Sequence, residues 1–567
     1  MSEVISIPFE PVPDGAQSAM VPMRDGVRLA TDIYLPEGDG RDLPTILVRM
    51  PYDKCGEYCF LPRIQEAFTE SGYAFVAQDV RGRTRSEGEN FPFISEVADG
   101  YDTLEWIVAQ PWSSGAVGMV GESYFGFTQW CAAASGHPAL KAIAPRVTSA
   151  NLGMAMEPAG DDAGTFALSA ILPWFSNVWV DNGMYETEFD WSLRPLRDVF
   201  AAATEGRRSA GTEMLLRQPL SDPWWMHAVY GSRDPYEAVD IPVLHWAAWW
   251  DNCQYGQFRA YRRMCGRPEV RDKQYLIADA VDHEGYLWDK SPWPTLDQRE
   301  FKASGHGSTE AEIVAFVDQY RGSVPFFDRF VRGVEGPALP RVRWMLTGEG
   351  WRESQSWPPP DSRAIELHLV RGEAAASGVD GGGLSLHPDA EDERVASVHD
   401  PSDLVPETIF DEWGPLGPGL PDERAVEGRP DVLTFTSEAM PAPLRLAGPV
   451  AFTARCQSTF HTLHLVAKLC DVDAEGYARR LLLGIAAVHQ ADFDRPVDVN
   501  LGDTGFVVEP GHRLRLEIAA SCFPRFLWHP GTNESPWDAV AGQAQTQSIV
   551  VGGPQGARLR LRVIDQH

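Results

Sequence analysis

The clearest chemical signal in the sequence surrounds one serine, Ser123. A short apolar run, 116–120, leads to Gly121 and then to Ser123. Gly126 follows and opens an apolar segment rich in small residues, 127–134. This order predicts a buried strand, a sharp turn and a helix, with the serine hydroxyl exposed at the turn, where a base can remove its proton. The second glycine lies one place later than in the generic motif, so the motif alone also fits a Gly-Ser turn without chemistry.

Two residues downstream supply the partners that a serine nucleophile needs. The hydroxyl requires a base, and the base requires a carboxylate that orients it. In an α/β-hydrolase sheet these follow in the order serine, acid, histidine, each from a loop after a strand. Asp251 follows the predicted strand 243–249, and His283 follows the predicted strand 274–278. The order predicts a triad in which Ser123 attacks, His283 moves the proton and Asp251 orients the ring.

Motifs spread along the whole chain resemble those of one hydrolase family. The elbow has the arrangement Gly-x-Ser-Tyr-x-Gly around Ser123 and Tyr124, and the further matching stretches are 47–54, 76–83, 102–106, 509–517 and 522–525. Together they make the chain resemble cocaine esterases, α-amino acid ester hydrolases, glutaryl-cephalosporin acylases and X-Pro dipeptidyl peptidases. The resemblance implies an α/β-hydrolase fold followed by a C-terminal jelly roll.

Two tyrosines are expected to form the oxyanion hole. The first donor is the backbone N–H of Tyr124, the residue after the nucleophile. The family takes its second donor from a tyrosine hydroxyl, and the resemblance assigns this role to Tyr52 in the stretch Met50-Pro51-Tyr52. Position alone leaves Tyr52 equally well explained as an ordinary, partly buried tyrosine. Donors of this kind are each worth roughly 3–4 kcal/mol of transition-state stabilisation.

The loops that carry the acid and the histidine depart from the family pattern. The family has a Gly-Trp-Tyr-Asp-like motif at the acid, and this chain has Ala248-Trp249-Trp250-Asp251. The family usually places Gly-Pro-Trp before the histidine, where this chain has Asp279-Ala-Val-Asp282. We therefore expect a differently shaped loop, and two carboxylates that raise the pKa of His283. Asp279 is the one plausible competitor to Asp251.

Aromatic side chains near the expected site predict a neutral substrate. Where amino-acid ester hydrolases of the family have an acidic residue after the Ser-Tyr pair, this chain has Phe125. An apolar pocket favours neutral acyl groups, because a free ammonium group needs a carboxylate to offset its desolvation. The expected pocket residues are Phe125, Trp174, Phe175, Trp249 and Trp250. The alternative is that acidic residues nearby provide such a carboxylate: Glu157, Asp161, Asp162 and Asp181.

The elements that must position these residues fall into three regions. In 1–150 and 241–355, predicted strands alternate with helices, which is typical of a mostly parallel sheet covered on both faces. Between them, 151–240 is helical and rich in large apolar residues, which predicts a cap over the active edge. The last region, 356–567, consists of short β-rich runs that predict an antiparallel sandwich. The predicted fold class is α/β: an α/β-hydrolase sheet with an inserted helical cap and a C-terminal jelly-roll domain.

Composition restricts the partners of this chain. Its 567 residues are too many for one core. A net charge of −31 argues against nucleic acid and anionic membrane surfaces, because both require a basic face. No apolar stretch approaches the roughly 20 residues that span a bilayer. Since the N-terminus also lacks the features of a signal peptide, we expect a cytoplasmic protein whose eight cysteines remain thiols.

No metal and no organic cofactor are expected. His461 and His464 would point to opposite faces of a strand and could not share an ion. The stretch Asp471–Gly476 lacks most of the ligands of a calcium loop.

The sequence predicts a serine hydrolase that cleaves a carboxylic ester of a small molecule through an acyl-enzyme. Within this class, the alternatives are an amide-cleaving acylase or X-Pro dipeptidyl peptidase, and an acyltransferase with the same triad. A hypothesis from another functional class is an inactive protein with a hydrolase fold, which binds a ligand through its sandwich domain. The natural substrate is not determined, and homodimer formation is left open.

Overall fold

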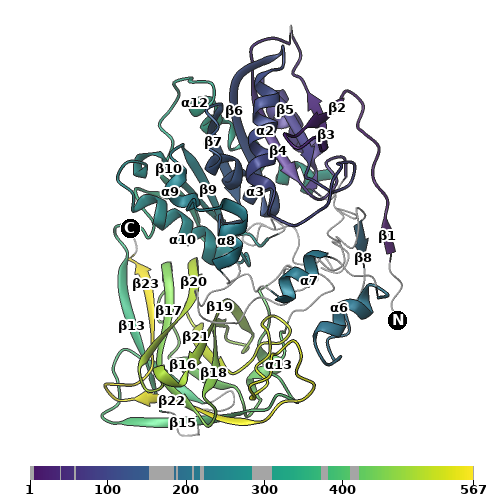
Figure 1. The fold of residues 1–567 in the computed structure, drawn as a ribbon. Helices are drawn as coiled ribbons and strands as arrows, with labels where there is room; N and C mark the ends of the chain where they lie inside the picture. The colour runs from purple at the N-terminus through teal and green to yellow at the C-terminus, as the bar shows by residue number, and fades with distance from the viewer. Residues whose placement is uncertain are drawn as a thin grey trace.

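Two bodies make up the molecule, one of mixed strands and helices and one made mainly of strands (Figure 1). The computed structural model describes residues 5–38, 40–56, 59–151, 184–186, 189–206, 210–217, 223–283, 310–371, 381–408 and 420–565. None of the helices in these ranges is long and apolar enough to cross a membrane. All eight cysteines are free thiols, as predicted.

The first body is built on a ten-stranded sheet with the order β12-β11-β10-β9-β7-β6-β4-β5-β3-β2. The central strands pair in parallel, and the pairs β2–β3, β3–β5 and β11–β12 are antiparallel. The strands are β2 (Gln17–Pro22), β3 (Arg28–Tyr34), β4 (Leu43–Met50), β5 (Ala74–Asp79), β6 (Ser113–Glu122), β7 (Leu140–Arg146), β9 (Val243–Ala248), β10 (Gln274–Asp279), β11 (Val342–Leu346) and β12 (Gly350–Ser354). The predicted α/β-hydrolase sheet is confirmed.

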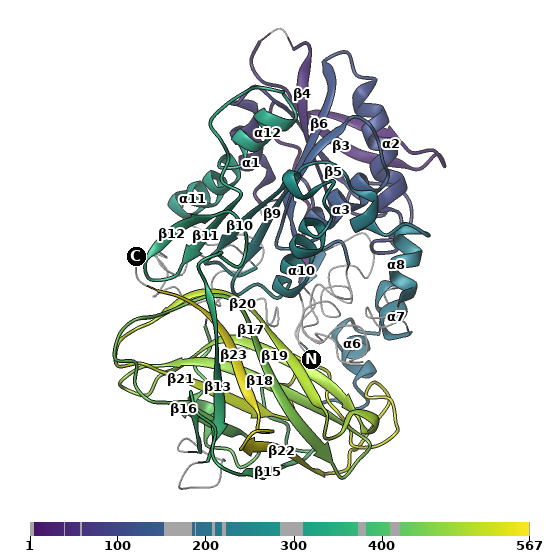
Figure 2. The same ribbon diagram turned by 90° about the vertical axis from the view of Figure 1, so that its left-hand side faces the viewer.

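Helices cover both faces of this sheet, as Figure 2 shows. Helices α1 (Leu61–Thr69), α11 (Glu310–Arg321) and α12 (Val324–Phe330) lie on one side, and α2 (Glu96–Val108), α3 (Ser123–Ala134) and α10 (Gln254–Cys265) lie on the other. Neighbouring residues of one strand enter different cores: Ile46 and Val48 pack in one cluster, and Leu47 packs in another. This alternation explains why the strands are apolar throughout, because both of their faces are buried.

Part of the region predicted as a cap is described, and its described helices are short. They are α6 (Arg197–Ala203), α7 (Ala210–Arg217), α8 (Pro223–Tyr230) and α9 (Pro235–Ala238). The same region contributes β8 (Met184–Glu186), which pairs with β1 (Ile5–Ile7) in an antiparallel two-stranded sheet. The N-terminal segment is thus joined to the inserted region by backbone pairing, which the sequence analysis did not predict.

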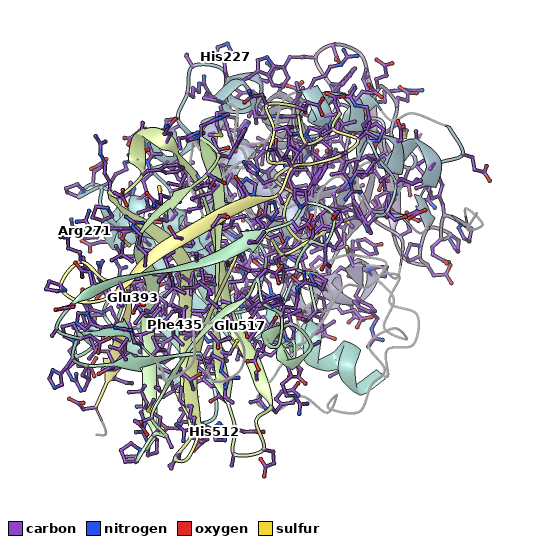
Figure 3. All side chains as sticks on the ribbon, turned by 90° about the horizontal axis from the view of Figure 1, so that it is seen from below. His227, Arg271, Glu393, Phe435, His512 and Glu517 are labelled. Atoms are coloured by element: carbon purple, nitrogen blue, oxygen red, sulfur yellow. The ribbon has the colours of Figure 1, made fainter. Side chains whose placement is uncertain are left out.

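The second body is a β-sandwich, seen from below in Figure 3, where Phe435 and Glu517 lie among its strands. Its ladder runs β15-β22-β17-β23-β13-β14-β16-β21-β18-β19, and β20 pairs with β17. The strands are β13 (Arg363–Val370), β14 (Gly382–Ser385), β15 (Asp392–His399), β16 (Leu433–Ser437), β17 (Leu444–Ser458), β18 (Thr462–Val472), β19 (Ala478–His489), β20 (Pro496–Val508), β21 (Arg513–Ala519), β22 (Gln545–Gly552) and β23 (Arg558–Ile564), with one short helix, α13 (Arg424–Glu427). Alternate residues of β17, Val450, Phe452 and Ala454, point into its core, as expected for a two-sheet sandwich.

One residue of the sandwich, Asp503 on β20, reaches into the first body. Its carboxylate accepts a hydrogen bond from Trp357 Nε1 at 2.8 Å and pairs with Arg262 of α10. Its backbone N–H donates to Gln254 Oε1 at 2.6 Å. The side-chain amide of Gln254 also donates to the carbonyl of Trp249. The sandwich is therefore hydrogen-bonded to the segment 249–254, which contains the predicted acid.

Candidate active site

Ser123 stands at a strained turn between a strand and a helix. Strand β6 ends at Glu122 and helix α3 begins at Ser123. The φ angle of Ser123 is 51°, in the left-handed region, which costs a non-glycine residue on the order of 1–3 kcal/mol. Gly121 has φ 138°, and a side chain at this position would overlap the ring of Phe125. The local structure matches the turn predicted from the glycine spacing.

The structure brings three predicted residues into one hydrogen-bonded chain. His283 Nε2 lies 3.0 Å from Ser123 Oγ, and His283 Nδ1 lies 2.6 Å from Asp251 Oδ1. Asp251 comes from the turn after β9, and His283 from the turn after β10. The second carboxylate oxygen of Asp251 accepts a hydrogen bond from Gln257 Nε2 at 2.6 Å. Both oxygens of Asp251 are thus satisfied, which fixes the plane of the carboxylate.

Gln257 is a residue of this site that the sequence analysis missed. It lies on α10, 4% exposed, and its carbonyl oxygen accepts from the backbone N–H of Ala248 at 3.2 Å. The signal that could have found it is a glutamine on the buried face of the helix that follows the acid.

The surroundings of His283 favour its charged form. Burial by itself lowers the pKa of His283, but the charge and hydrogen bond of Asp251 raise it, and a hydrogen bond with Cys253 adds to the rise. The net pKa is well above the ordinary value of histidine. The sequence analysis attributed such a rise to Asp279 and Asp282, whereas the largest raising contributions come from Asp251 and Cys253. Asp279 instead accepts from the backbone N–H of Ala280 at 2.8 Å.

The side chain of Tyr124, the residue after the predicted nucleophile, is anchored in a buried polar network. Its hydroxyl donates to Glu96 Oε1 at 2.8 Å and accepts from the backbone N–H of Phe93 at 2.9 Å. The rings of Tyr124 and Phe93 stack with centroids 4.9 Å apart. The backbone N–H of Tyr124 lies in the first turn of α3, where backbone donors have no acceptor within the helix. The hydroxyl is thus held by Glu96 and Phe93, and the backbone N–H remains the predicted oxyanion donor.

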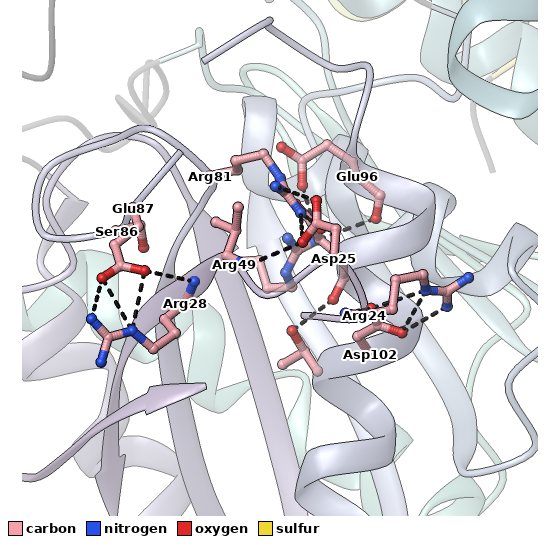
Figure 4. Close-up of polar contacts among 12 residues, drawn as sticks. Arg24, Asp25, Arg28, Arg49, Arg81, Ser86, Glu87, Glu96 and Asp102 are labelled. Atoms are coloured by element: carbon pink, nitrogen blue, oxygen red, sulfur yellow. Dashed lines mark hydrogen bonds and ion pairs between the residues drawn. The ribbon is translucent and has the colours of Figure 1, made fainter. Parts of the chain in front are cut away.

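Arginine side chains pair with acidic residues of α2, the helix that contains Glu96 (Figure 4). Arg49 Nη1 pairs with Glu96 Oε2 at 2.8 Å, and both side chains are buried. Along the same helix, Arg81 pairs with Asp99 at 2.6 Å and Arg24 pairs with Asp102 at 2.6 Å. These ion pairs fix α2, and through Glu96 they fix the side chain of Tyr124. No local sequence pattern around Glu96 predicted this contact.

Tyr52 lies in the turn after β4 and is 8% exposed. Its ring packs edge-on against Phe125, with the ring centroids 6.3 Å apart. Phe125 itself is 1% exposed and belongs to the main core of the first body.

The other aromatic residues predicted to bind substrate occupy different places. Trp249 has no exposed area, stacks on Phe258 with centroids 5.6 Å apart, and donates from Nε1 to the carbonyl of Met345 at 2.9 Å. It packs in the cluster that joins the two bodies, so its placement does not fit a role in substrate binding. Trp250 is partly buried and packs against the sandwich core and the cluster that joins the two bodies.

Several predicted residues cannot be placed. Trp174 and Phe175, and the acidic residues Glu157, Asp161, Asp162 and Asp181, lie outside the described residues.

An ion pair that the sequence analysis did not predict involves Glu122, the residue before the predicted nucleophile. Glu122 Oε2 lies 3.1 Å from Arg146 Nη1, at the end of the neighbouring strand β7. Burial raises the pKa of Glu122, and Arg146 opposes that rise. The guanidinium of Arg146 lies over the rings of Trp246 and Phe316, 5.0 and 5.2 Å from their centroids. A charged residue at the end of an apolar strand was the only sequence signal for this pair.

Two family models match the chain. Residues 25–284 match the model described as X-Pro dipeptidyl-peptidase (S15 family). Residues 335–558 match the X-Pro dipeptidyl-peptidase C-terminal non-catalytic domain. The first match contains Ser123, Asp251 and His283, and the second covers most of the sandwich.

Similar proteins align over most of their length. Cocaine esterase from Rhodococcus sp. (strain MB1 Bresler) is 31% identical over 549 residues, covering 90% of this chain and 91% of the relative. A putative serine esterase from Mycobacterium bovis is 25% identical and covers 91% of each chain. Among solved structures, an α-amino acid ester hydrolase has a TM-score of 0.78 at 25% identity and covers 98% of each chain. An aminopeptidase from a marine sediment archaeon, Thaumarchaeota archaeon, shares the fold with a TM-score of 0.78 at 22% identity.

Proposed function

This chain belongs to the cocaine esterase and X-Pro dipeptidyl-peptidase (S15) family of α/β-hydrolases, and from this premise we propose that it cleaves carboxylic esters of small molecules through an acyl-enzyme. The observation that carries the proposal is the hydrogen-bonded chain from Ser123 through His283 to Asp251. A serine hydroxyl is a weak nucleophile unless a positioned base takes its proton, and this geometry provides the base.

Each residue of the proposed triad acts once while the acyl-enzyme forms and once while it is hydrolysed. Ser123 Oγ attacks the carbonyl carbon while His283 Nε2 takes the hydroxyl proton. His283 then gives that proton to the leaving alcohol. In the second half, water attacks the acyl-enzyme while His283 takes its proton, and the return of that proton to Ser123 releases the acid. Asp251 holds Nδ1 and stabilises the imidazolium that forms in both halves.

The oxyanion of the tetrahedral intermediate needs donors that are in place before attack. We assign this role to the backbone N–H of Tyr124 and the hydroxyl of Tyr52. The anchoring of the Tyr124 side chain by Glu96 and Phe93 supports the first assignment, because it fixes the peptide next to Ser123. Preorganised donors stabilise the transition state more than flexible ones, since they need no reorganisation during the reaction.

The proposed preference for neutral esters rests on Phe125. It occupies the position after the Ser-Tyr pair, and its packing against Tyr52 places an apolar ring beside the proposed oxyanion donor. Phe125 offers no carboxylate to offset the desolvation of a charged amine. The names of the curated relatives, cocaine esterase and serine esterase, agree with ester cleavage.

A second candidate, cleavage of amides after an X-Pro dipeptide, is favoured by the descriptions of both matching family models. Amide and ester cleavage use the same triad and differ in the leaving group, so the choice depends on which substrate the pocket positions.

Labelling with a fluorophosphonate tests the proposed nucleophile. We expect the probe to modify the protein at Ser123 and to leave Ser123→Ala unmodified, with the fold unchanged by circular dichroism. An unlabelled wild-type protein would instead support a hydrolase fold that only binds ligands.

Comparison of three substrates tests the proposed specificity. We expect kcat/KM to be highest for phenyl benzoate, lower for phenylglycine methyl ester and lowest for an X-Pro anilide. A preference for either amine-bearing substrate would overturn the neutral-ester proposal and leave the nucleophile assignment intact.

A further inference from the structure

Three different metal-ligating groups meet beside the proposed base. Asp251, Cys253 and His283 offer a carboxylate oxygen, a thiol sulfur and a ring nitrogen that all lie within 4.8 Å of one another. Carboxylate, thiolate and imidazole form a mixed donor set that Zn²⁺ binds. Hydrolysis by a serine nucleophile needs no thiol at this place, so the proposed mechanism does not account for Cys253.

The three groups are already close to the spacing of a metal site. His283 Nδ1 lies 2.6 Å from Asp251 Oδ1, and the sulfur of Cys253 lies within 4.8 Å of the ligand atoms of both residues. With Zn–N and Zn–O distances of about 2.0–2.2 Å and a Zn–S distance of about 2.3 Å, the ligands of a tetrahedral site stand roughly 3–4 Å apart. A small opening of the Asp251–His283 pair would therefore admit an ion.

The position of Cys253 in the chain explains this proximity. It is the residue that precedes the first turn of α10, two places after Asp251, and it is 4% exposed. The backbone of Gln254 donates to the carbonyl of Asp251 at 3.1 Å, so the chain folds back at this point. The turn that presents Asp251 to His283 thus presents Cys253 as well.

We propose that Asp251, Cys253 and His283 form an inhibitory binding site for a thiophilic divalent cation of the zinc type, Zn²⁺ or Cd²⁺. The ion would take the place of the hydrogen bond between Nδ1 and Asp251. The thiol proton and the Nδ1 proton would pass to solvent, and water would complete the coordination. Inhibition rests on the proposed function, whereas binding does not.

Inhibition follows from what the ion does to the triad. Asp251 would bind the metal and would no longer orient His283. A dication bound at Nδ1 would also oppose the positive charge that the ring must carry when Nε2 accepts the serine proton. The site is distinct from a resident cofactor site, because the ion would block the reaction that the same residues perform.

Metal sensitivity of activity gives the first test. The esterase rate is measured against increasing ZnCl₂ for the wild type, Cys253→Ser, Cys253→Ala and Cys265→Ser, each normalised to its own metal-free rate. Cys265 is the matched control, since it lies at the other end of the same helix. We expect half-inhibition of the Cys253 variants to require at least about tenfold more zinc, as for loss of a coordinating group.

We expect EDTA to restore the full esterase rate of the wild type. We also expect zinc to inhibit Cys265→Ser as strongly as it inhibits the wild type. Equal zinc sensitivity of the wild type and both Cys253 variants would overturn the proposal. So would a wild type that zinc does not inhibit.

Direct binding gives the second test, independent of activity. Ser123→Ala is titrated with CdCl₂, and the ultraviolet thiolate-to-cadmium charge-transfer band is followed. In Ser123→Ala we expect this band to saturate at one cadmium ion per protein molecule. In the double variants that add Cys253→Ser or Cys253→Ala we expect no band. Thermal unfolding checks that each variant is folded. A band that persists in both double variants, or none in Ser123→Ala, would overturn the site. A protein that binds cadmium through Cys253 but lacks esterase activity would contradict the proposed function and not the site.

Discussion

At the scale of single residues, one hydrogen bond distinguishes the proposed orienting acid, Asp251, from its competitor, Asp279. Two carboxylates follow neighbouring strands, Asp251 after β9 and Asp279 at the end of β10. Only Asp251 lies at hydrogen-bond distance from Nδ1 of His283 among the contacts described, while Asp279 binds the backbone of its own loop. The role of an acid in such a triad is to select the histidine tautomer, so its exact partner decides the chemistry.

We expect Asp251→Asn to lower kcat on the order of 10⁴-fold, because an amide in this place favours the wrong tautomer of His283. Asp279→Asn is the matched control and should keep most of the activity. Steady-state kinetics on a neutral aryl ester measures both. A larger loss in Asp279→Asn would mean that the acid is misassigned.

The hydroxyl of Tyr52 is proposed to act only after attack, so its removal should appear in kcat and not in KM. For Tyr52→Phe we expect a loss of about a hundredfold or more in kcat, corresponding to about 3 kcal/mol of lost stabilisation of the oxyanion. The measurement is the separate determination of kcat and KM. A change confined to KM would make Tyr52 a residue that binds substrate.

At the scale of elements, α2 holds Tyr124, the residue next to the proposed nucleophile. Its first residue, Glu96, joins the buried guanidinium of Arg49 to the hydroxyl of Tyr124. Removing one partner of a buried ion pair leaves the other charge uncompensated, which costs more than losing a neutral hydrogen bond. The helix therefore couples the stability of the first body to the placement of the peptide after Ser123.

Two variants separate the contribution of the Tyr124 hydroxyl from that of the Glu96–Arg49 ion pair. Tyr124→Phe should lower the free energy of unfolding by about 1–3 kcal/mol and leave kcat within about tenfold, because the backbone N–H stays in place. Glu96→Gln should destabilise more, by about 3–5 kcal/mol, since Arg49 loses its counter-charge. Denaturant unfolding and kinetics on the folded protein provide both quantities. A loss of activity in Tyr124→Phe as deep as in Ser123→Ala would show that the hydroxyl itself contacts the reacting atoms.

At the scale of the whole molecule, the sandwich contains a group of buried histidines that makes its stability depend on pH. His399, His464 and His529 are 2%, 8% and 7% exposed, and the rings of His464 and His529 meet at 4.9 Å between centroids. Burial lowers the pKa of all three, to about 4 for His529 and well below the ordinary value for His464. The charged or titratable groups around them are Asp400, Asp431, His461 and His489.

Because these histidines bind protons more weakly in the folded state, the unfolded state takes up more protons as pH falls. Stability contributed by their neutral forms is present above about pH 6.5 and is lost as pH falls towards 4. We expect the thermal midpoint to fall between pH 7 and pH 5, and His464→Leu to reduce the steepness of that fall. His227→Gln is the control, since His227 lies exposed on α8 (Figure 3). An identical pH dependence in wild type and His464→Leu would contradict the assignment.

Much of this fold and of the central site could be predicted from local sequence patterns. Apolar strands that alternate with helices predict a parallel sheet, and strand order then predicts where a serine, an acid and a histidine will meet. Ser123 and His283 are 160 residues apart in the chain but 3.0 Å apart in the structure, as the order of motifs implied. These features are predictable because buried strands and glycine turns impose their constraints on neighbouring residues.

Only the tertiary structure decided how particular side chains are used. The sequence placed Trp249 in a substrate pocket, but the indole packs between the two bodies, where Asp503 and Trp357 meet the acid loop. It expected the eight cysteines to remain thiols and assigned Cys253 no role, but the turn before α10 brings the sulfur beside His283. The residues next to Trp249 do not specify its contact with Met345, and those next to Cys253 do not specify its proximity to His283, because both partners come from distant segments. Which neighbour a side chain meets depends on the packing of whole elements, and that is determined only when the chain has folded.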